Sequence, residues 1–212
     1  MITIIIFTDR TFCYVHNVIT TLDKVMISSS GTDGKLGNWP YMQYCPAGWF
    51  VKAIQIKYQV NKGENERKDD TSLNMVGMRC YRRNVSPYVR MIFGLDKSLY
   101  RKLSSDHYGD WGSVYSCSGK DNPVVGFRMQ IETTGCKDCV GANNIHLRCK
   151  NGQILRPRVQ NDWGSWSDWV LCPSGKAVIA LQTRTAWPLY GPRYHDNITL
   201  NGVRLICNKY DF

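Results

Sequence analysis

Apolar and polar residues alternate along several short runs of this chain, while a helical period is scarce. Residues 51–58 read V-K-A-I-Q-I-K-Y, and residues 124–132 repeat this kind of alternation. Such a pattern is typical of β-strands that bury one face. Clusters of Gly, Asn, Asp and Pro separate the runs, as turns between strands require. The sequence therefore predicts an all-β protein.

Three further runs, residues 75–80, 145–149 and 203–207, each end in a cysteine. In each run every second position is apolar: Val76, Met78, Ile145, Leu147, Val203 and Leu205. The positions between them are occupied by Gly77, His146 and Arg204. Successive side chains of a strand point to opposite faces. We therefore expect the apolar set to face a core and the second set to face out.

A threefold internal repeat organises these runs. A tryptophan precedes the first cysteine of each copy by six residues, in the pairs Trp39–Cys45, Trp111–Cys117 and Trp166–Cys172. Each copy then closes at Cys80, Cys149 or Cys207. One small β unit cannot bury its apolar face alone, so such units pack together. The repeat predicts three small sheets around a pseudo-threefold axis with one common core.

The repeat also suggests how the chain is divided. We expect residues 23–212 to form a single domain of three copies, at about residues 24–82, 88–150 and 153–208. Residues 1–22 match no later segment and are treated as an N-terminal extension that contains the odd cysteine, Cys13. The apolar residues 2–7 lack the basic flank and cleavage pattern of a signal peptide. No run approaches the ~18 apolar residues of a membrane span.

Nine cysteines are many for 212 residues, and most occupy equivalent repeat positions. The repeat predicts the disulfides Cys45–Cys80, Cys117–Cys149 and Cys172–Cys207. Each would close a loop of about 35 residues and stabilise the fold by roughly 4 kcal/mol in the chain-entropy model. A local disulfide between Cys136 and Cys139 is expected, because a redox motif of that spacing belongs in a βαβ unit. Paired cysteines indicate an oxidising, extracellular location, and no metal site is expected.

The repeated motifs carry a family resemblance. They comprise W-G-S-W at residues 163–166, the C-P-x-G turns at Cys45 and Cys172, and D-D-T-S-L-N-M-V-G-M-R-C at residues 69–80. Over about residues 24–208 the chain resembles the vitelline membrane outer layer protein 1 family. The resemblance implies a type I β-prism of three four-stranded Greek-key sheets. It also implies secretion, with a place in the egg's outer coat or in secreted fluids.

The chain is basic: 27 Lys and Arg face 17 Asp and Glu, for a net charge of +10. Such a charge suits an acidic partner, for example a sulfated or sialylated glycan, or simply a soluble surface. No nucleic-acid-binding motif is present. The candidate binding residues are Arg82, Arg83, Arg156 and Arg158 between the copies, and the aromatic Trp187, Tyr190 and Tyr194. Asn197 begins an N-I-T glycosylation sequon.

Two readings of function remain open. Asp69 and Asp70 are the first candidates for a catalytic carboxylate pair, in an enzyme acting on N-acetylglucosamine oligosaccharides as the resemblance suggests. Aspartates also recur at the equivalent turns, as Asp138 and Asp196, which favours a turn-stabilising role, and the repeated asparagines receive the same interpretation. The repeated tryptophans favour packing over sugar stacking. We therefore expect a non-catalytic coat or fluid protein, without cofactors, that binds carbohydrate or a partner protein.

Overall fold

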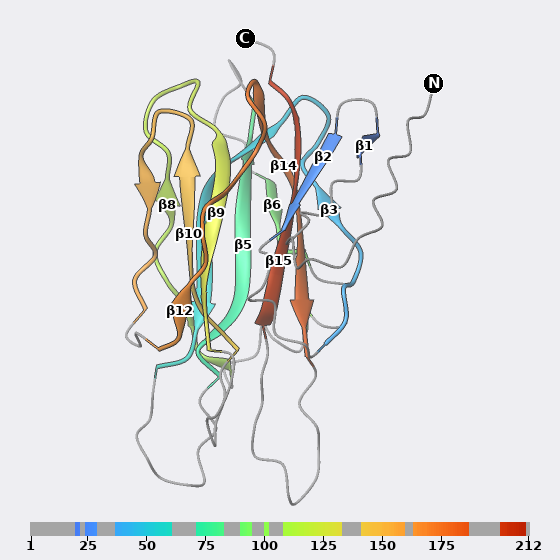
Figure 1. The fold of residues 1–212 in the computed structure, drawn as a ribbon. Coiled ribbons are helices and arrows are strands. Elements are labelled where there is room, and N and C mark those ends of the chain that lie inside the picture. Colours follow the sequence, from blue (N-terminus) through green and yellow to red (C-terminus); the bar gives the residue numbers. More distant parts are fainter. Residues whose placement is uncertain are drawn as a thin grey trace, which may run out of the picture.

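The computed structural model shows an all-β chain whose strands run close to one long axis (Figure 1). It describes residues 20–21, 24–28, 37–60, 71–82, 90–94, 100–101, 108–132, 141–159, 163–186 and 200–210. The strands form three antiparallel sheets, named here sheets A, B and C. Sheet A has the order β1-β2-β15-β14-β3, sheet B has β6-β5-β4-β7 with β8, and sheet C has β11-β10-β9-β12 with β13.

One pair of long strands from each repeat forms the centre of each sheet. These pairs are β4 (Phe50–Tyr58) with β5 (Leu73–Tyr81), β9 (Val124–Ile131) with β10 (Ala142–Cys149), and β14 (Lys176–Thr185) with β15 (Leu200–Lys209). The alternating and cysteine-ending runs of the sequence lie in these strands, so their prediction is confirmed. Each central pair is local in sequence, because its two strands belong to the same copy.

The short strands at the start of each repeat join the sheet of a neighbouring repeat. The first strand of each copy pairs with the closing long strand of the neighbouring copy: β2 (Lys24–Ser28) with β15, β6 (Arg90–Ile92) with β5, and β11 (Ile154–Leu155) with β10. The next short strands pair with the other long strand of the same sheet. In sheet A, β14 pairs with β3 (Gln43–Tyr44). In sheet B, β4 pairs with β7 (Asp110–Trp111) and β8 (Tyr115–Ser116), and in sheet C, β9 pairs with β12 (Ser165–Trp166) and β13 (Val170–Leu171). The first copy therefore completes the sheet of the last, and the three sheets close into a ring. A short β1 (Thr20–Thr21) adds to the free side of β2.

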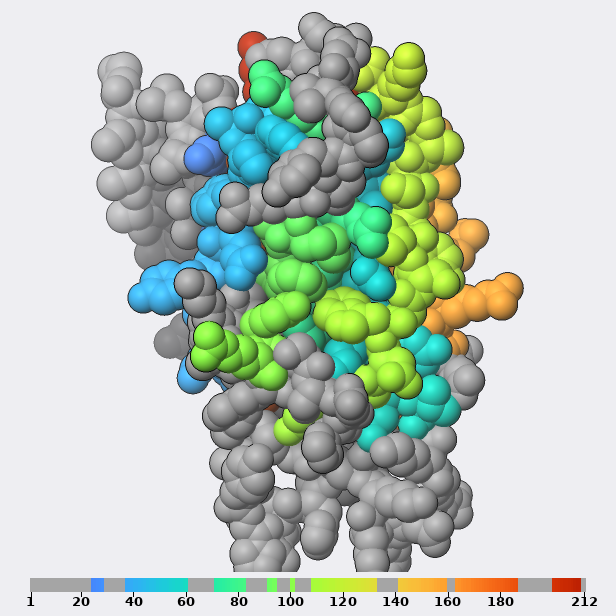
Figure 2. Space-filling view, turned by 180° about the vertical axis from the view of Figure 1, so that it is seen from behind, coloured from blue at the N-terminus to red at the C-terminus, as the bar shows by residue number. Residues whose placement is uncertain are grey.

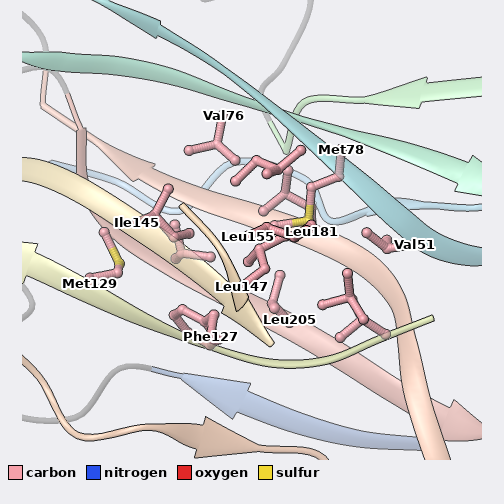
Figure 3. Packing of buried hydrophobic residues seen from close by; sticks show 14 of the residues in the cluster. Val51, Val76, Met78, Phe127, Met129, Ile145, Leu147, Leu155, Leu181 and Leu205 are labelled. Atoms are coloured by element: carbon pink, nitrogen blue, oxygen red, sulfur yellow. The ribbon is translucent and has the colours of Figure 1, made fainter. Parts of the chain in front are cut away.

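The common core lies where the three sheets meet (Figure 3). All six apolar positions of the closing strands have no exposed surface, namely Val76, Met78, Ile145, Leu147, Val203 and Leu205. The prediction that this set faces the core is confirmed. The second set faces outward as predicted, yet His146 is only 8% exposed and Gly77 is also buried. Both residues lie on the outer side of a sheet, but other side chains cover them there.

Three disulfides join the core to one end of the prism. They link Cys45 to Cys80, Cys117 to Cys149 and Cys172 to Cys207, with sequence separations of 35, 32 and 35. These are the pairs that the repeat spacing predicts. Each disulfide closes a loop within its own copy. By restricting the unfolded chain, each raises the free energy of unfolding by about 4 kcal/mol in the chain-entropy model.

Repeated glycines and asparagines connect neighbouring copies. The residue two before each repeat tryptophan is a glycine with positive φ, and it crosses the opposite strand so closely that a Cβ atom would lie 2.0–2.3 Å from a carbonyl oxygen; these are Gly37, Gly109 and Gly164. Asn74 Nδ2 donates to the carbonyl of Tyr108 at 2.9 Å, and Asn143 Nδ2 donates to that of Trp163 at 2.8 Å. Asn74 Nδ2 also donates to the nearby Ser72 carbonyl at 3.3 Å, so this asparagine has a local role as well as a bond to the next copy.

Candidate functional site

The repeat tryptophan lies against the outer face of each sheet, and its neighbours differ from sheet to sheet. On sheet A the Trp39 ring stacks on Arg204, whose guanidinium carbon is 3.9 Å from the ring centroid. On sheet B Trp111 lies 5.8 Å from the Phe93 ring, and Phe93 in turn contacts Tyr100 at 4.7 Å. A partly buried tryptophan on a sheet face agrees with the packing role predicted from its regular spacing.

Sheet B has an apolar outer face. Met75 is fully buried beneath Phe93, Tyr100, Tyr108 and Trp111. In the space-filling view the green residues 90–94 and 100–101 lie between the blue residues 37–50 and the yellow-green residues 108–120 (Figure 2). The absence of a side chain at Gly77 makes room for this cover, since a Cβ there would lie 2.8 Å from the Met91 methyl and 3.1 Å from the Phe93 ring.

Sheet C carries charge at the same place. Arg128 on β9 and His146 on β10 are directly opposite each other. The guanidinium carbon of Arg128 lies 4.5 Å from the Trp166 ring centroid and 5.1 Å from that of Trp169. The His146 ring lies 4.0 Å from the Trp166 ring. Two indoles, a guanidinium and an imidazole thus form one stacked cluster, which we call the Arg128 cluster.

The polar contacts of Arg128 are few for an arginine. Its Nη2 lies 3.3 Å from His146 Nδ1, and its Nε is buried without a hydrogen-bond partner. Within the described ranges, no carboxylate forms an ion pair with it. Stacking on tryptophan is worth about 0.5–1 kcal/mol per exposed contact, and more when the cation is desolvated. The two indoles therefore hold the guanidinium in place where a counter-ion would ordinarily do so.

The contact with Arg128 also defines the tautomer of His146. A guanidinium has N–H donors and no acceptor, so Nδ1 of His146 must accept the bond and a neutral His146 carries its proton on Nε2. Burial, and to a lesser degree the positive charges of Arg128 and Arg156, together lower the pKa of His146 to about 4. The imidazole is therefore neutral at physiological pH and adds no charge to the cluster.

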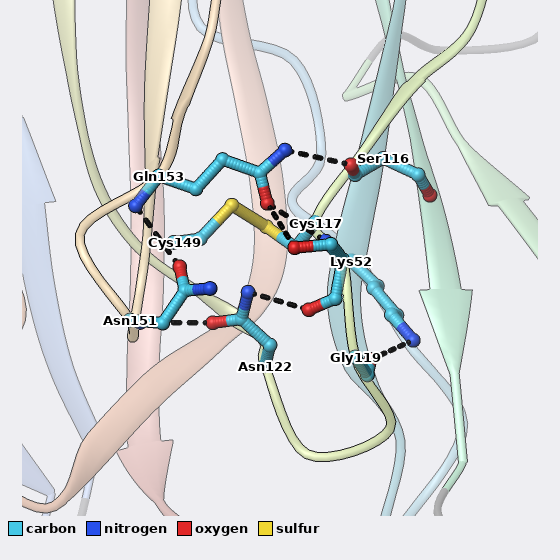
Figure 4. The surroundings of a disulfide bond; sticks show 9 residues. Lys52, Ser116, Cys117, Gly119, Asn122, Cys149, Asn151 and Gln153 are labelled. Atoms are coloured by element: carbon cyan, nitrogen blue, oxygen red, sulfur yellow. Dashed lines mark hydrogen bonds between the residues drawn. A yellow bond between two sulfur atoms is a disulfide. The ribbon is translucent and has the colours of Figure 1, made fainter.

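The second charged region is the end of the prism that carries the disulfides, called here the disulfide end. Hydrogen bonds order the turns around Cys117–Cys149: Gln153 Oε1 accepts from the amide and hydroxyl of Ser118 at 2.8 and 2.9 Å, and Lys52 Nζ donates to the Gly119 carbonyl at 2.6 Å (Figure 4). The basic side chains described at this end include Lys24, Lys52, Arg82, Lys120, Lys150, Lys176 and Lys209. The carboxylate described there is that of Asp121. Burial lowers the pKa of Lys52, against the attraction of Asp121.

The structure separates the site residues proposed from sequence. Arg82, Arg156 and Arg158 are exposed; Arg82 lies at the disulfide end, and the charge of Arg156 acts on His146. The remaining candidates lie outside the described residues: Asp69, Asp70, Arg83, Cys136, Cys139, Trp187, Tyr190, Tyr194 and Asn197. Among described residues, no group of three His, Cys, Asp or Glu side chains could hold a metal ion. No helix described here is long and apolar enough to cross a membrane.

Sequence reasoning missed Arg128 and His146. The available signal was a departure from the repeat: the residues paired across the two central strands are Gln55 with Gly77, Arg128 with His146, and Gln182 with Arg204. Two copies have glutamine where the middle copy has arginine. The one-residue difference in spacing from the first cysteine hides this equivalence until the strands are paired.

Comparison with known proteins places the chain in a family. The family described as Vitelline membrane outer layer protein I (VOMI) matches residues 26–158 and 153–212. The human vitelline membrane outer layer protein 1 homolog is 32% identical over 178 residues, covering 82% of this chain and 78% of that protein. The mouse homolog is 30% identical over 176 residues, covering 82% of this chain and 79% of that protein.

Solved structures confirm the β-prism fold. Calystegia sepium agglutinin has a TM-score of 0.51 at 10% identity, covering 91% of this chain and all of that one. Artocarpin in complex with mannopentose has a TM-score of 0.50 at 10% identity, covering 89% and 99% of the two chains. At such low identity the likeness concerns the fold alone. The family match and the two mammalian relatives, in contrast, extend over most of the sequence, and this chain belongs to the vitelline membrane outer layer protein I family.

Proposed function

We propose that this chain is an extracellular coat or fluid protein that binds anionic carbohydrate, without catalysis, through its disulfide end. The observation that carries the proposal is the excess of positive charge at this end. Among described residues, the disulfide end presents at least seven basic side chains and the single carboxylate of Asp121. The other described carboxylates, those of Asp110, Glu132 and Asp168, belong to other parts of the sheets. One-signed surfaces of this kind attract and orient polyanions.

Aromatic rings lie beside the lysines of the disulfide end. Lys52 Nζ is 4.3 Å from the centroid of the Tyr81 ring, and Lys150 Nζ is 5.3 Å from that of Tyr210. Phe50 packs edge-on against Tyr210 at 4.7 Å. Ring faces offer apolar contact to sugar rings, and ammonium groups attract sulfate or carboxylate groups. The combination favours an acidic polysaccharide over an acidic peptide, which would need a sheet edge or groove for its backbone.

The location rests on two supports. Three disulfides persist in oxidising compartments, which for a chain of this kind means outside the cell. The family name and the names of both mammalian relatives refer to an egg-coat layer. The lectin neighbours support carbohydrate binding only as an analogy of fold.

A glycan array tests the proposal, with neutral chito-oligosaccharides beside sulfated and sialylated glycans at low and high salt. Binding to sulfated glycans that weakens as salt rises is expected, because salt screens exposed charges beyond about 10 Å at 0.1 M. The variant Lys150→Gln/Lys209→Gln should lose most of this binding. Its matched control, Arg101→Gln/Arg158→Gln, removes the same charge elsewhere and should retain it. Equal losses in both variants would refute a site at the disulfide end.

The non-catalytic part of the proposal has a separate test. Glycosyl transfer needs two carboxylates on either side of one sugar bond, and Asp69 and Asp70 are the pair to examine. Incubation with chito-oligosaccharides should leave the oligosaccharides intact. Turnover that disappears in Asp69→Ala/Asp70→Ala would replace the binding function by the enzymatic one.

A further inference from the structure

We propose that the Arg128 cluster on the outer face of sheet C is a second binding site, which takes the carboxylate of a single acidic sugar residue. The inference rests on the proposed carbohydrate-binding function for the class of ligand. It concerns a different surface, however, so the two sites can fail independently.

The first argument is that Arg128 replaces a glutamine whose side chain makes a structural hydrogen bond in the other two sheets. On sheet B Gln55 Nε2 donates to the carbonyl of Gly112 at 2.9 Å, and on sheet A Gln182 Nε2 donates to the carbonyl of Pro40. Each acceptor is the residue after the repeat tryptophan. Both glutamines therefore tie the short outer segment to the long strand. At the third equivalent position Arg128 has no such bond, and its guanidinium lies over the rings of Trp166 and Trp169 instead.

Sheet C holds its outer segment with a backbone bond that sheet B shares, from Gly112 to Ile56, and with one side-chain bond of its own. The Met129 amide donates to Ser167 Oγ at 3.1 Å, and the Ser167 amide donates to the Met129 carbonyl at 2.8 Å. The outer segment consequently does not depend on the side chain of Arg128. An arginine that the sheet does not need, and that replaces a glutamine which the other sheets use, is free to serve a ligand.

The second argument is the supply of hydrogen-bond donors. A guanidinium has five N–H bonds. In Arg128 the Nε bond is buried without a partner, and one Nη2 bond is directed to His146 Nδ1. Three N–H bonds then remain for a ligand, on a plane that two indole rings hold fixed. A planar carboxylate accepts two parallel bonds from such a group, which gives a strong and directional contact.

The charges around the guanidinium favour an anion. Arg156, which follows β11, is exposed and adds its positive charge at His146 on β10. Neutral His146 accepts one N–H bond but has no negative charge with which to compete against the ligand for Arg128. Asp168, between Trp166 and Trp169 in sequence, is exposed and forms no ion pair with Arg128 in the described part of the chain. The rings of Trp166 and Trp169 are partly exposed and supply apolar surface for the sugar.

The test titrates the folded, oxidised protein with methyl glucuronide and follows the tryptophan indole N–H resonances. Methyl glucoside is the neutral control, and methyl glucoside 6-sulfate distinguishes a sulfate from a carboxylate. We expect the glucuronide to bind at least tenfold more tightly than either. Arg128→Gln should abolish this preference, whereas Arg158→Gln, which removes the same charge from an exposed position, should preserve it. Arg128→Gln should fold, since glutamine occupies the same position in sheets A and B.

The outcomes separate the two sites. Equal affinity for glucuronide and glucoside, tighter binding of the sulfate, or equal effects of Arg128→Gln and Arg158→Gln would each overturn the carboxylate site. A glucuronide preference that survives in Lys150→Gln/Lys209→Gln would support it, even where the array shows no polyanion binding at the disulfide end. Loss of sulfated-polymer binding in that double variant bears on the proposed function alone.

Discussion

The outer faces of sheets B and C share a backbone and a tryptophan but differ in chemistry. On sheet B Trp111 joins an apolar cluster over Gly77, and Gln55 bonds the neighbouring carbonyl. On sheet C Trp166 stacks on Arg128 and His146, and that glutamine bond is absent. Two side-chain positions in one strand pair account for the contrast. A repeated scaffold can therefore hold a tryptophan in the same place while single substitutions decide whether it seals a face or builds a charged site.

The shared backbone should respond identically on both faces, and here we expect the largest effect. In Gly109→Ala and Gly164→Ala the new Cβ would meet a carbonyl at 2.0 and 2.3 Å, at residues whose φ is 80°. Strain and overpacking together should lower the free energy of unfolding by roughly 4 kcal/mol. Gly119→Ala is the control, because its φ of 84° is similar but no atom lies within 4 Å. Urea denaturation that shows equal losses at all three positions would rule out the close approach as the cause.

The tryptophans themselves should differ between the two faces. Trp111→Ala removes a ring from an apolar cluster and should lower the free energy of unfolding by about 3 kcal/mol, as large core truncations do. Trp166→Ala removes a ring from polar neighbours and should lower it by about 1–2 kcal/mol, mostly through lost cation–π contacts. Thermal denaturation of both variants measures the difference. A larger loss for Trp166→Ala would mean that the Arg128 cluster serves stability first.

His146 of sheet C should make the stability of the fold sensitive to mild acid, because the equivalent residues of sheets B and A are Gly77 and Arg204. The pKa of His146 is about 4 in the folded protein against 6.5 for an ordinary histidine. The unfolded chain therefore takes up the proton first, and stability falls as the pH drops from about 6.5 to 4. The loss should amount to roughly 2 kcal/mol after allowance for solvent at the edge of the cluster. His146→Gln should remove this part of the pH dependence, and an unchanged difference between pH 7 and pH 4 would contradict it.

The smallest effect on stability is expected where the effect on binding is greatest. Arg128→Gln substitutes the residue of sheets A and B and removes a buried Nε that has no partner. Lost stacking and relieved desolvation should nearly cancel, leaving the free energy of unfolding within about 0.5 kcal/mol of the native value. A calorimetric comparison checks this. A large loss would show that Arg128, like Gln55, holds the sheet together.

The sequence by itself determined the repeat, the strand class, the core positions and the family. Regular spacing is a local property, and Val76 and Met78 follow from period-2 alternation regardless of their partners. The pairs Cys45–Cys80, Cys117–Cys149 and Cys172–Cys207 are likewise local to one copy. Alternation separates the two faces of a strand but does not show what covers the outer one. For this reason the alternation predicted the outward direction of His146 but not its burial beneath Trp166.

Only the tertiary structure decided which copies share a sheet. The short strands β7 and β12 belong in sequence to copies two and three but line β4 and β9 of the preceding copies. Two-residue strands have too few hydrogen bonds to choose a partner alone, so packing of the whole ring selects it. That exchange brings Trp166 and Trp169 over Arg128, nearly 40 residues earlier in the chain. The Arg128 cluster therefore exists because a neighbouring copy supplies its cover, which spacing within one copy could not reveal.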